Sequence, residues 1–201
     1  MSEEMKNDRV SFSDVMKKAL HLGGTLFAVT AVTGLLLGLV ENITSKAILQ
    51  AEIAARNEAY QLVMPDGKTF TEESAKPDDF VRGVVKAEGD SGIVGWCISV
   101  ESKGYGGMVG FVVGITKDGV VKAINILSHS ETPGLGAKST EPEFYGQFAD
   151  KSQMPLKVVK GGASNPDEIA AISGATITST AVVDGVNAAY NYWNANLKGA
   201  E

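Results

Sequence analysis

The chain opens with a polar segment that is followed by a long uncharged one. Residues 1–18 mix acidic and basic side chains, whereas residues 19–40 contain no Asp, Glu, Lys or Arg and consist mainly of Leu, Val, Ala, Phe and Gly. At about 1.5 Å per residue, a helix of this length crosses a hydrocarbon core of ~30 Å. A cleaved signal peptide is the main alternative, but its apolar region usually spans ~7–15 residues and ends at a small-residue cleavage site. The pattern therefore predicts a retained transmembrane helix over residues 19–40.

The basic residues that flank this span predict its orientation. Four lie in residues 1–18, two of them directly before the span, and two, Lys46 and Arg56, follow it. Because cytoplasmic flanks carry more Lys and Arg, we expect the N-terminus in the cytoplasm and the rest of the chain on the extracytoplasmic side.

Beyond the span, the pattern changes from helical to strand-like. Residues 41–66 are rich in helix formers and end in a Pro-Asp-Gly turn, which predicts a juxtamembrane helix or linker. Alternating apolar runs follow, and Asp118-Gly119 is typical of a tight hairpin. A short helix is expected over residues 139–150, and the predicted strands are 81–85, 93–100, 108–115, 120–127, 156–159 and 168–172. Strands grouped with helices between and after them predict an α+β domain over residues 67–201, with an antiparallel sheet and flanking helices.

The stretch from Ser173 to Thr180 crowds hydroxyl side chains at the start of the last predicted helix. Thr178, Ser179 or Thr180 can cap this helix, because a short side-chain oxygen accepts from an unpaired amide of the first turn. Gly174 and Ala175 leave room for a bulky group near the backbone, and free amides at a helix start attract an anion. Two interpretations remain open at this point, a capped helix after a small-residue turn and a binding site.

Two glycine-containing stretches precede that helix. Gly104–Gly110 lacks the spacing of a dinucleotide-binding fingerprint and comes before a strand, so it is interpreted as a glycine-rich turn, one that can admit a flat ligand. Glu131–Gly136 (ETPGLG) forms either a surface turn or a rigid loop with free amides. In the second interpretation Glu131 and Thr132 offer polar partners to a heterocycle, and Leu135 packs on its face.

Composition excludes several classes of function. The chain has 24 acidic against 18 basic residues and a pI of about 5.0, so a nucleic-acid partner is not expected. One cysteine excludes an internal disulfide framework and a cysteine-ligated iron–sulfur cluster. Cys97 lies in an apolar run and is predicted to be a buried core thiol. His21 and His129 are far apart in the sequence, so neither a zinc site nor a histidine-based triad is predicted.

The apolar span, GYGGMVG, SHSETPGLGAK and AISGATITSTAVVDGVN occur in an order that resembles the G subunit of the Rnf electron-transport complex. The C subunit of the sodium-pumping NADH:quinone oxidoreductase is similar. The resemblance implies an FMN-binding domain in which the FMN phosphate is esterified to the last residue of SGAT, which is Thr176 here. A separate flavin transferase that uses FAD as donor would install the cofactor. The implied cofactor-binding residues are Thr176, Ser173, Gly174, Ala175, Thr178, Glu131, Thr132, Gly134, Leu135, Gly136 and Lys160. For Lys160, a solvated side chain is the alternative to a phosphate contact.

The same resemblance implies the biological role. The chain is expected to be a subunit of the cell (inner) membrane that relays electrons through covalent FMN within a ferredoxin:NAD⁺ oxidoreductase coupled to Na⁺ or H⁺ translocation. It would work with other membrane and peripheral subunits and have no independent catalytic activity. The alternatives are a C-type subunit of a quinone-reducing pump, an extracellular FMN-binding electron-transfer module outside a pump, and an anchor protein without a cofactor. The short connection between span and domain favours the Rnf type.

Overall fold

The structure, a computed structural model, describes residues 12–76 and 78–199 of the 201-residue chain. The basic residues Lys6 and Arg9, which contribute to the predicted orientation, lie outside the described residues. The chain divides into two compact units, Met1–Ile53 and Ala54–Glu201.

The first unit consists of most of helix α1 (Phe12–Val63). Within α1, Leu20–Ser45 is long and apolar enough to cross a membrane, with a mean hydropathy of 1.9, and it is the one such helix in the described part of the chain. The hydroxyls of Thr30 and Thr33 donate to carbonyls one turn earlier, at 3.0 and 2.8 Å. These side chains therefore satisfy their hydrogen-bonding groups inside the helix, as an apolar environment requires. The bounds of the predicted segments (1–18, 19–40, 41–66 and 67–201) stay a prediction.

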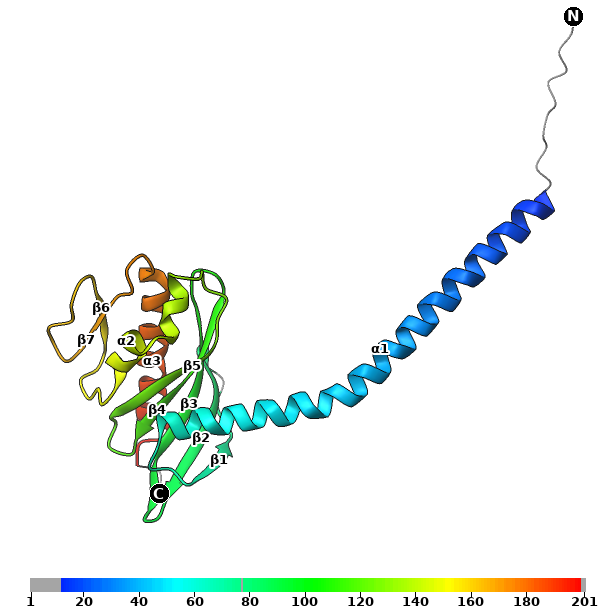
Figure 1. Ribbon diagram of the computed structural model, residues 1–201. Helices are drawn as coiled ribbons and strands as arrows, with labels where there is room; N and C mark the ends of the chain where they lie inside the picture. Colours follow the sequence, from blue (N-terminus) through cyan, green and yellow to red (C-terminus); the bar gives the residue numbers. More distant parts are fainter. Residues whose placement is uncertain (1–11, 77, 200–201) are drawn as a thin grey trace, which may run out of the picture. The chain divides into compact units, whose positions relative to one another are not determined.

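The second unit is built on a five-stranded antiparallel sheet in which neighbouring strands are consecutive in the sequence (Figure 1). Its strands are β1 (Thr69–Glu73), β2 (Val81–Gly89), β3 (Gly92–Lys103), β4 (Met108–Thr116) and β5 (Val121–Ser128). The four strands predicted between residues 81 and 127 are confirmed as β2 to β5 of the antiparallel sheet. The hairpin predicted at Asp118-Gly119 is also confirmed, and the positive φ of 84° at Gly119 suits glycine. Sequence patterning missed β1, because this edge strand is polar and mostly exposed.

Each face of the sheet is covered by a different helix. Helix α3 (Thr176–Asn196) packs its buried residues, among them Val182, Val186 and Trp193, against one face. The apolar residues of this helix recur at three- and four-residue steps in the sequence, which is typical of a helix with one buried side. The last turns of α1 cover part of the other face. Tyr60 and Val63 of the helix, and Met64 directly after it, pack there on Val85, Ala87, Cys97 and Val112. The α+β class expected from the sequence is confirmed.

Between the sheet and α3, the chain forms short segments rather than the single helix predicted over residues 139–150. The observed elements are η1 (Gly136–Thr140), α2 (Pro142–Tyr145) and η2 (Gly146–Phe148). Pro142 starts α2 because it cannot donate to a preceding turn, and α2 gives way at Gly146 to the 3₁₀ turn η2. Strands β6 (Lys157–Val159) and β7 (Glu168–Ala170) then pair in parallel as a small second sheet.

Cys97 is buried in the middle of β3, which confirms the sequence-based prediction. Burial disfavours the charged thiolate and raises the pKa of the Cys97 thiol to about 12. At pH 8 only about one molecule in ten thousand then carries the reactive thiolate. We expect the native protein to resist thiol-reactive dyes at pH 8 for hours and to be labelled fully once guanidinium unfolds it. Rapid labelling of the folded chain would contradict this burial.

Candidate functional site

Helix α3 begins earlier than the sequence predicts, and its hydroxyls do not cap it. The helix starts at Thr176, directly after Gly174 at φ 76° and Ala175, and no side chain makes a capping hydrogen bond. Thr178, Ser179 and Thr180 therefore lie inside the first two turns, and the capping prediction is wrong. The glycine in the left-handed region turns the chain at residue 174, so the helix is already under way when these hydroxyls are reached.

Ser179 and Thr178 use their hydroxyls within the fold instead. The Ser179 hydroxyl donates to the carbonyl of Ala175 and accepts from the amide of Ile172, both at 3.0 Å, which ties the turn before α3 to the helix. The Thr178 hydroxyl donates to Oε2 of Glu131 at 2.7 Å. Both side chains are buried, whereas Thr176 is exposed. Of these three hydroxyl residues, only Thr176 is open to solvent.

Thr176 lies at a cleft of about 590 Å³ that three separate segments enclose. These segments are the glycine-rich turn between β3 and β4, the loop after β5, and the start of α3. The lining residues are Tyr105, Glu131, Thr132, Leu135, Gly136, Gly174, Ala175, Thr176, Ile177 and Thr178. The structure thus brings together eight of the eleven residues named from the sequence. Ser173, Gly134 and Lys160 do not line this cleft.

Apolar side chains give the cleft surfaces on which a flat ring can pack. Leu135 is 43% exposed and Ile177 is 56% exposed, both unusually open for such residues, and Tyr105 stands at the rim. A Cβ at Gly174 would lie 3.0 Å from Cδ2 of Leu135, so a larger residue there would crowd the leucine. Tyr105 and Ile177 were not predicted as site residues from the sequence. The features that could have indicated them are a large side chain directly between two glycines, for Tyr105, and a large apolar side chain at a helix start, for Ile177.

The cleft also has a place for an anion. The first amides of an α-helix have no intrahelical acceptor, and the helix dipole adds positive potential there. Because Thr176 is the first residue of α3, its own amide is one of these groups. The combination of an exposed hydroxyl, a helix start and open apolar side chains fits a phosphorylated aromatic cofactor such as FMN.

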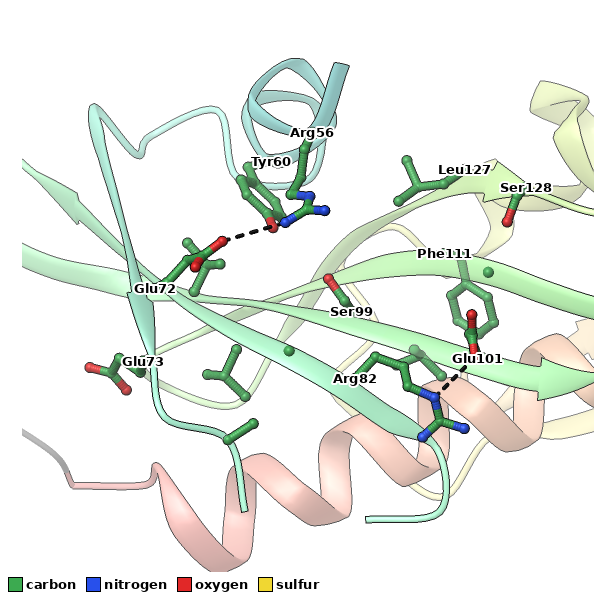
Figure 2. Close-up of a pocket in the computed structure, with 16 residues that line it drawn as sticks. Arg56, Tyr60, Glu72, Glu73, Arg82, Ser99, Glu101, Phe111, Leu127 and Ser128 are labelled. Carbon is green, nitrogen blue, oxygen red and sulfur yellow. Dashed lines mark hydrogen bonds and ion pairs between the residues drawn. The ribbon is translucent and has the colours of Figure 1, made fainter. Parts of the chain in front are cut away.

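A second hollow, of about 560 Å³, lies beside the last turns of α1 and has a different character (Figure 2). Two ion pairs lie at this hollow: Arg56 with Glu72 at 3.4 Å, and Arg82 with Glu101 at 2.9 Å. Residues without bulky side chains, such as Gly83, Ser99 and Gly110, form part of its floor. None of the residues named from the sequence as site residues lines it, so the cleft at Thr176 remains the candidate site.

Comparison with known proteins agrees with this location. Residues 104–191, which include every residue of the cleft, match the FMN-binding domain family. The G subunit of the proton-translocating ferredoxin:NAD(+) oxidoreductase complex from Clostridium ljungdahlii is 36% identical over 172 residues, which cover 82% of this chain and 90% of that protein. The chain belongs to the G subunits of Rnf-type ion-translocating oxidoreductases. The resemblance seen in the sequence motifs is confirmed.

Two further comparisons place this G subunit relative to the C subunits. The C subunit of the Na(+)-translocating NADH-quinone reductase from Yersinia pestis is 34% identical, but over only 52% of this chain and 42% of that one. The crystal structure of Shewanella oneidensis NqrC superposes with a TM-score of 0.50 at 25% identity, covering 62% of this chain and 68% of NqrC. The similarity to the C subunits therefore covers a smaller part of this chain than the similarity to the G subunits does.

Proposed function

We propose that this G subunit holds FMN bound through its phosphate to Oγ1 of Thr176. We further propose that it relays electrons within an Rnf-type ferredoxin:NAD⁺ oxidoreductase that moves Na⁺ or H⁺ across a membrane. The observation that carries the proposal is the exposed hydroxyl of Thr176 at the first residue of α3, beside a cleft with open apolar side chains. The match of residues 104–191 to the FMN-binding domain family supports FMN as the ligand.

The attachment is a phosphoryl transfer in which Thr176 is the acceptor. Its hydroxyl oxygen attacks the FMN-side phosphorus of FAD, a new O–P bond forms, the bond to the AMP phosphate breaks, and AMP leaves. The hydroxyl proton passes to a base that a separate flavin transferase supplies. The amides at the start of α3 favour the phosphoryl charge by about 0.3–1 kcal/mol. Lys160 does not line the cleft, so we assign the phosphate contact to these amides rather than to the lysine.

The remaining cleft residues hold the ring of the cofactor. Leu135 and Ile177 offer apolar surface, and the exposed Thr132 offers a hydroxyl and an amide to the edge of the heterocycle. Attachment through the phosphate leaves the isoalloxazine free for one- and two-electron chemistry. A covalent bond also prevents the loss of cofactor from a site on the extracytoplasmic side, where we place this domain on the basis of the basic N-terminal flank. In this assignment α1 is the membrane anchor, and the partners are the other subunits of the complex.

Mass spectrometry tests the proposal directly. When the chain is produced together with a flavin transferase and FAD, its intact mass should rise by one FMN less one water. The tryptic peptide from Gly161 to Lys198 should carry the whole increase, and fragmentation should place it on Thr176. An unmodified chain under these conditions, or an adduct on Ser173 or Thr178, would refute the assignment.

A further inference from the structure

We propose that Glu131 is a positioning residue whose carboxylate fixes the three walls of the cleft and thereby presents Thr176 for flavin attachment. This inference rests on the proposed function of the site. It assigns Glu131 a task different from the one expected from sequence, in which this residue contacts the heterocycle.

The carboxylate of Glu131 joins all three segments that enclose the cleft. Glu131 belongs to the loop after β5, and its side chain is buried, with the residue only 6% exposed. Oε1 accepts from the amide of Gly106 at 3.1 Å, in the glycine-rich turn. Oε2 accepts from the hydroxyl of Thr178 at 2.7 Å, in the first turn of α3. Both carboxylate oxygens thus accept a hydrogen bond from the protein, and we assign the ring contacts to Thr132, Leu135 and Ile177.

The glycines around Glu131 show that the fold reserves space for this carboxylate. A Cβ at Gly104 would overlap Oε1 of Glu131. A Cβ at Gly136 would overlap Oε2 and would lie 2.6 Å from Oγ1 of Thr178. One glycine in each motif, Gly104 before β4 and Gly136 after β5, therefore leaves room for the carboxylate of Glu131.

The position of Thr178 explains how this contact reaches the attachment site. Thr178 is two residues after Thr176 in the same first turn of α3. Thr178 is buried and held by Glu131, so the helix start cannot rotate without breaking a short hydrogen bond to a carboxylate. The backbone of Thr176 is fixed with it. Phosphoryl transfer depends steeply on the alignment of the attacking oxygen, and a misplacement of about 1 Å can cost ~100-fold in rate.

The test compares initial rates of flavin attachment with purified full-length chain, transferase and FAD. Thr178→Val keeps the shape of the side chain but leaves Oε2 unpaired, and Glu131→Ala removes the whole contact. Both should slow attachment by roughly 10- to 100-fold while the chain stays folded. Thr178→Ser, which restores the hydroxyl, should recover most of the rate lost in Thr178→Val. Glu131→Gln should lie well above Glu131→Ala, because its amide can accept from Gly106 and donate to Thr178.

A second readout separates positioning from a loss of stability. Hydrogen exchange of the amides at residues 174–178 should speed up in Thr178→Val, while the exchange of the sheet stays unchanged. Thr180→Val is the matched control, because Thr180 is an exposed residue of the same type on the same helix. This control should match the wild type in both measurements. Equal attachment rates in wild type, Thr178→Val and Glu131→Ala would overturn the inference, as would a rate loss fully explained by unfolding.

The two proposals fail in different ways. If the wild type gains FMN at Thr176 but the Glu131 and Thr178 variants gain it equally fast, the positioning role of Glu131 is refuted and the proposed function is not. If the wild type gains none, the proposed function falls, and the exchange measurement still decides whether Glu131 holds the start of α3.

Discussion

A Thr176→Val chain produced with the flavin transferase is expected to fold normally and to show no covalent flavin, with in-gel fluorescence at background. Valine keeps the shape and β-branching of threonine but has no oxygen to attack the phosphorus. Stability should change little, within about 0.5 kcal/mol, because Thr176 is exposed and makes no capping hydrogen bond. Fluorescence of the denatured chain under ultraviolet light, together with its thermal unfolding by circular dichroism, measures both parts of this expectation.

Two companion variants make that result specific. Thr176→Ser retains a hydroxyl at the same helix position and should still accept flavin, whereas Thr180→Val should be labelled like the wild type. Fluorescence that persists in Thr176→Val would move the attachment to another residue. Loss of fluorescence in Thr180→Val would point to a general effect of changing the first turns of α3 rather than to an acceptor.

A Trp193→Ala chain is expected to lose about 3–5 kcal/mol of unfolding free energy, as removal of a buried tryptophan usually does. Trp193 is 1% exposed and lies near the C-terminal end of α3. Its ring packs against the tip of the β4–β5 hairpin, where a Cβ at Gly119 would lie 2.7 Å from Cη2. The unfolding temperature should fall by roughly 6–20 °C for a domain of this size. Circular dichroism of the full chain in detergent measures the shift.

The neighbouring residue provides the control for this core variant. Asn194 is exposed, one position further along α3, so Asn194→Ala should change the unfolding temperature very little. Trp193→Phe should fall between the wild type and Trp193→Ala, because it keeps one ring in the space. A loss below about 1 kcal/mol in Trp193→Ala would contradict the packing of α3 on the hairpin.

Much of the fold follows from local patterns in the sequence. The alternation in β2 to β5 and the spacing of Val182, Val186 and Trp193 reflect one buried side per element, which a short window of sequence reveals. Strand β1 was not predicted from the sequence because it lies at the edge of the sheet, and most of its side chains are exposed, so it shows no apolar alternation. The start of α3 was misjudged because the sequence offers several hydroxyls that could cap a helix, whereas the positive φ of Gly174 turns the chain before them, so the helix begins at Thr176 with no side-chain cap.

The sequence indicated the separate binding stretches of the site but not the contacts between them. ETPGLG and SGAT each suggested a binding loop through their glycines and polar groups. Their relation depends on the hydrogen bond between Glu131 and Thr178, which are 47 residues apart. No local pattern encodes a contact over such a separation. For the same reason, the sequence suggested a heterocycle contact for Glu131, while the structure shows its oxygens already in use.

The consecutive order of the strands has a consequence for maturation. Each strand of the meander pairs with the one just synthesised, so the sheet can assemble from contacts that are close in the sequence. The cleft, by contrast, needs the turn at Gly104–Gly107, the loop at Glu131–Gly136 and the start of α3, which lie far apart in the chain. The strands can therefore begin to pair before the attachment site is complete. Under the proposed function, only chains in which α3 has packed against the sheet would receive flavin. Covalent flavin would therefore distinguish fully folded chains from incompletely folded ones.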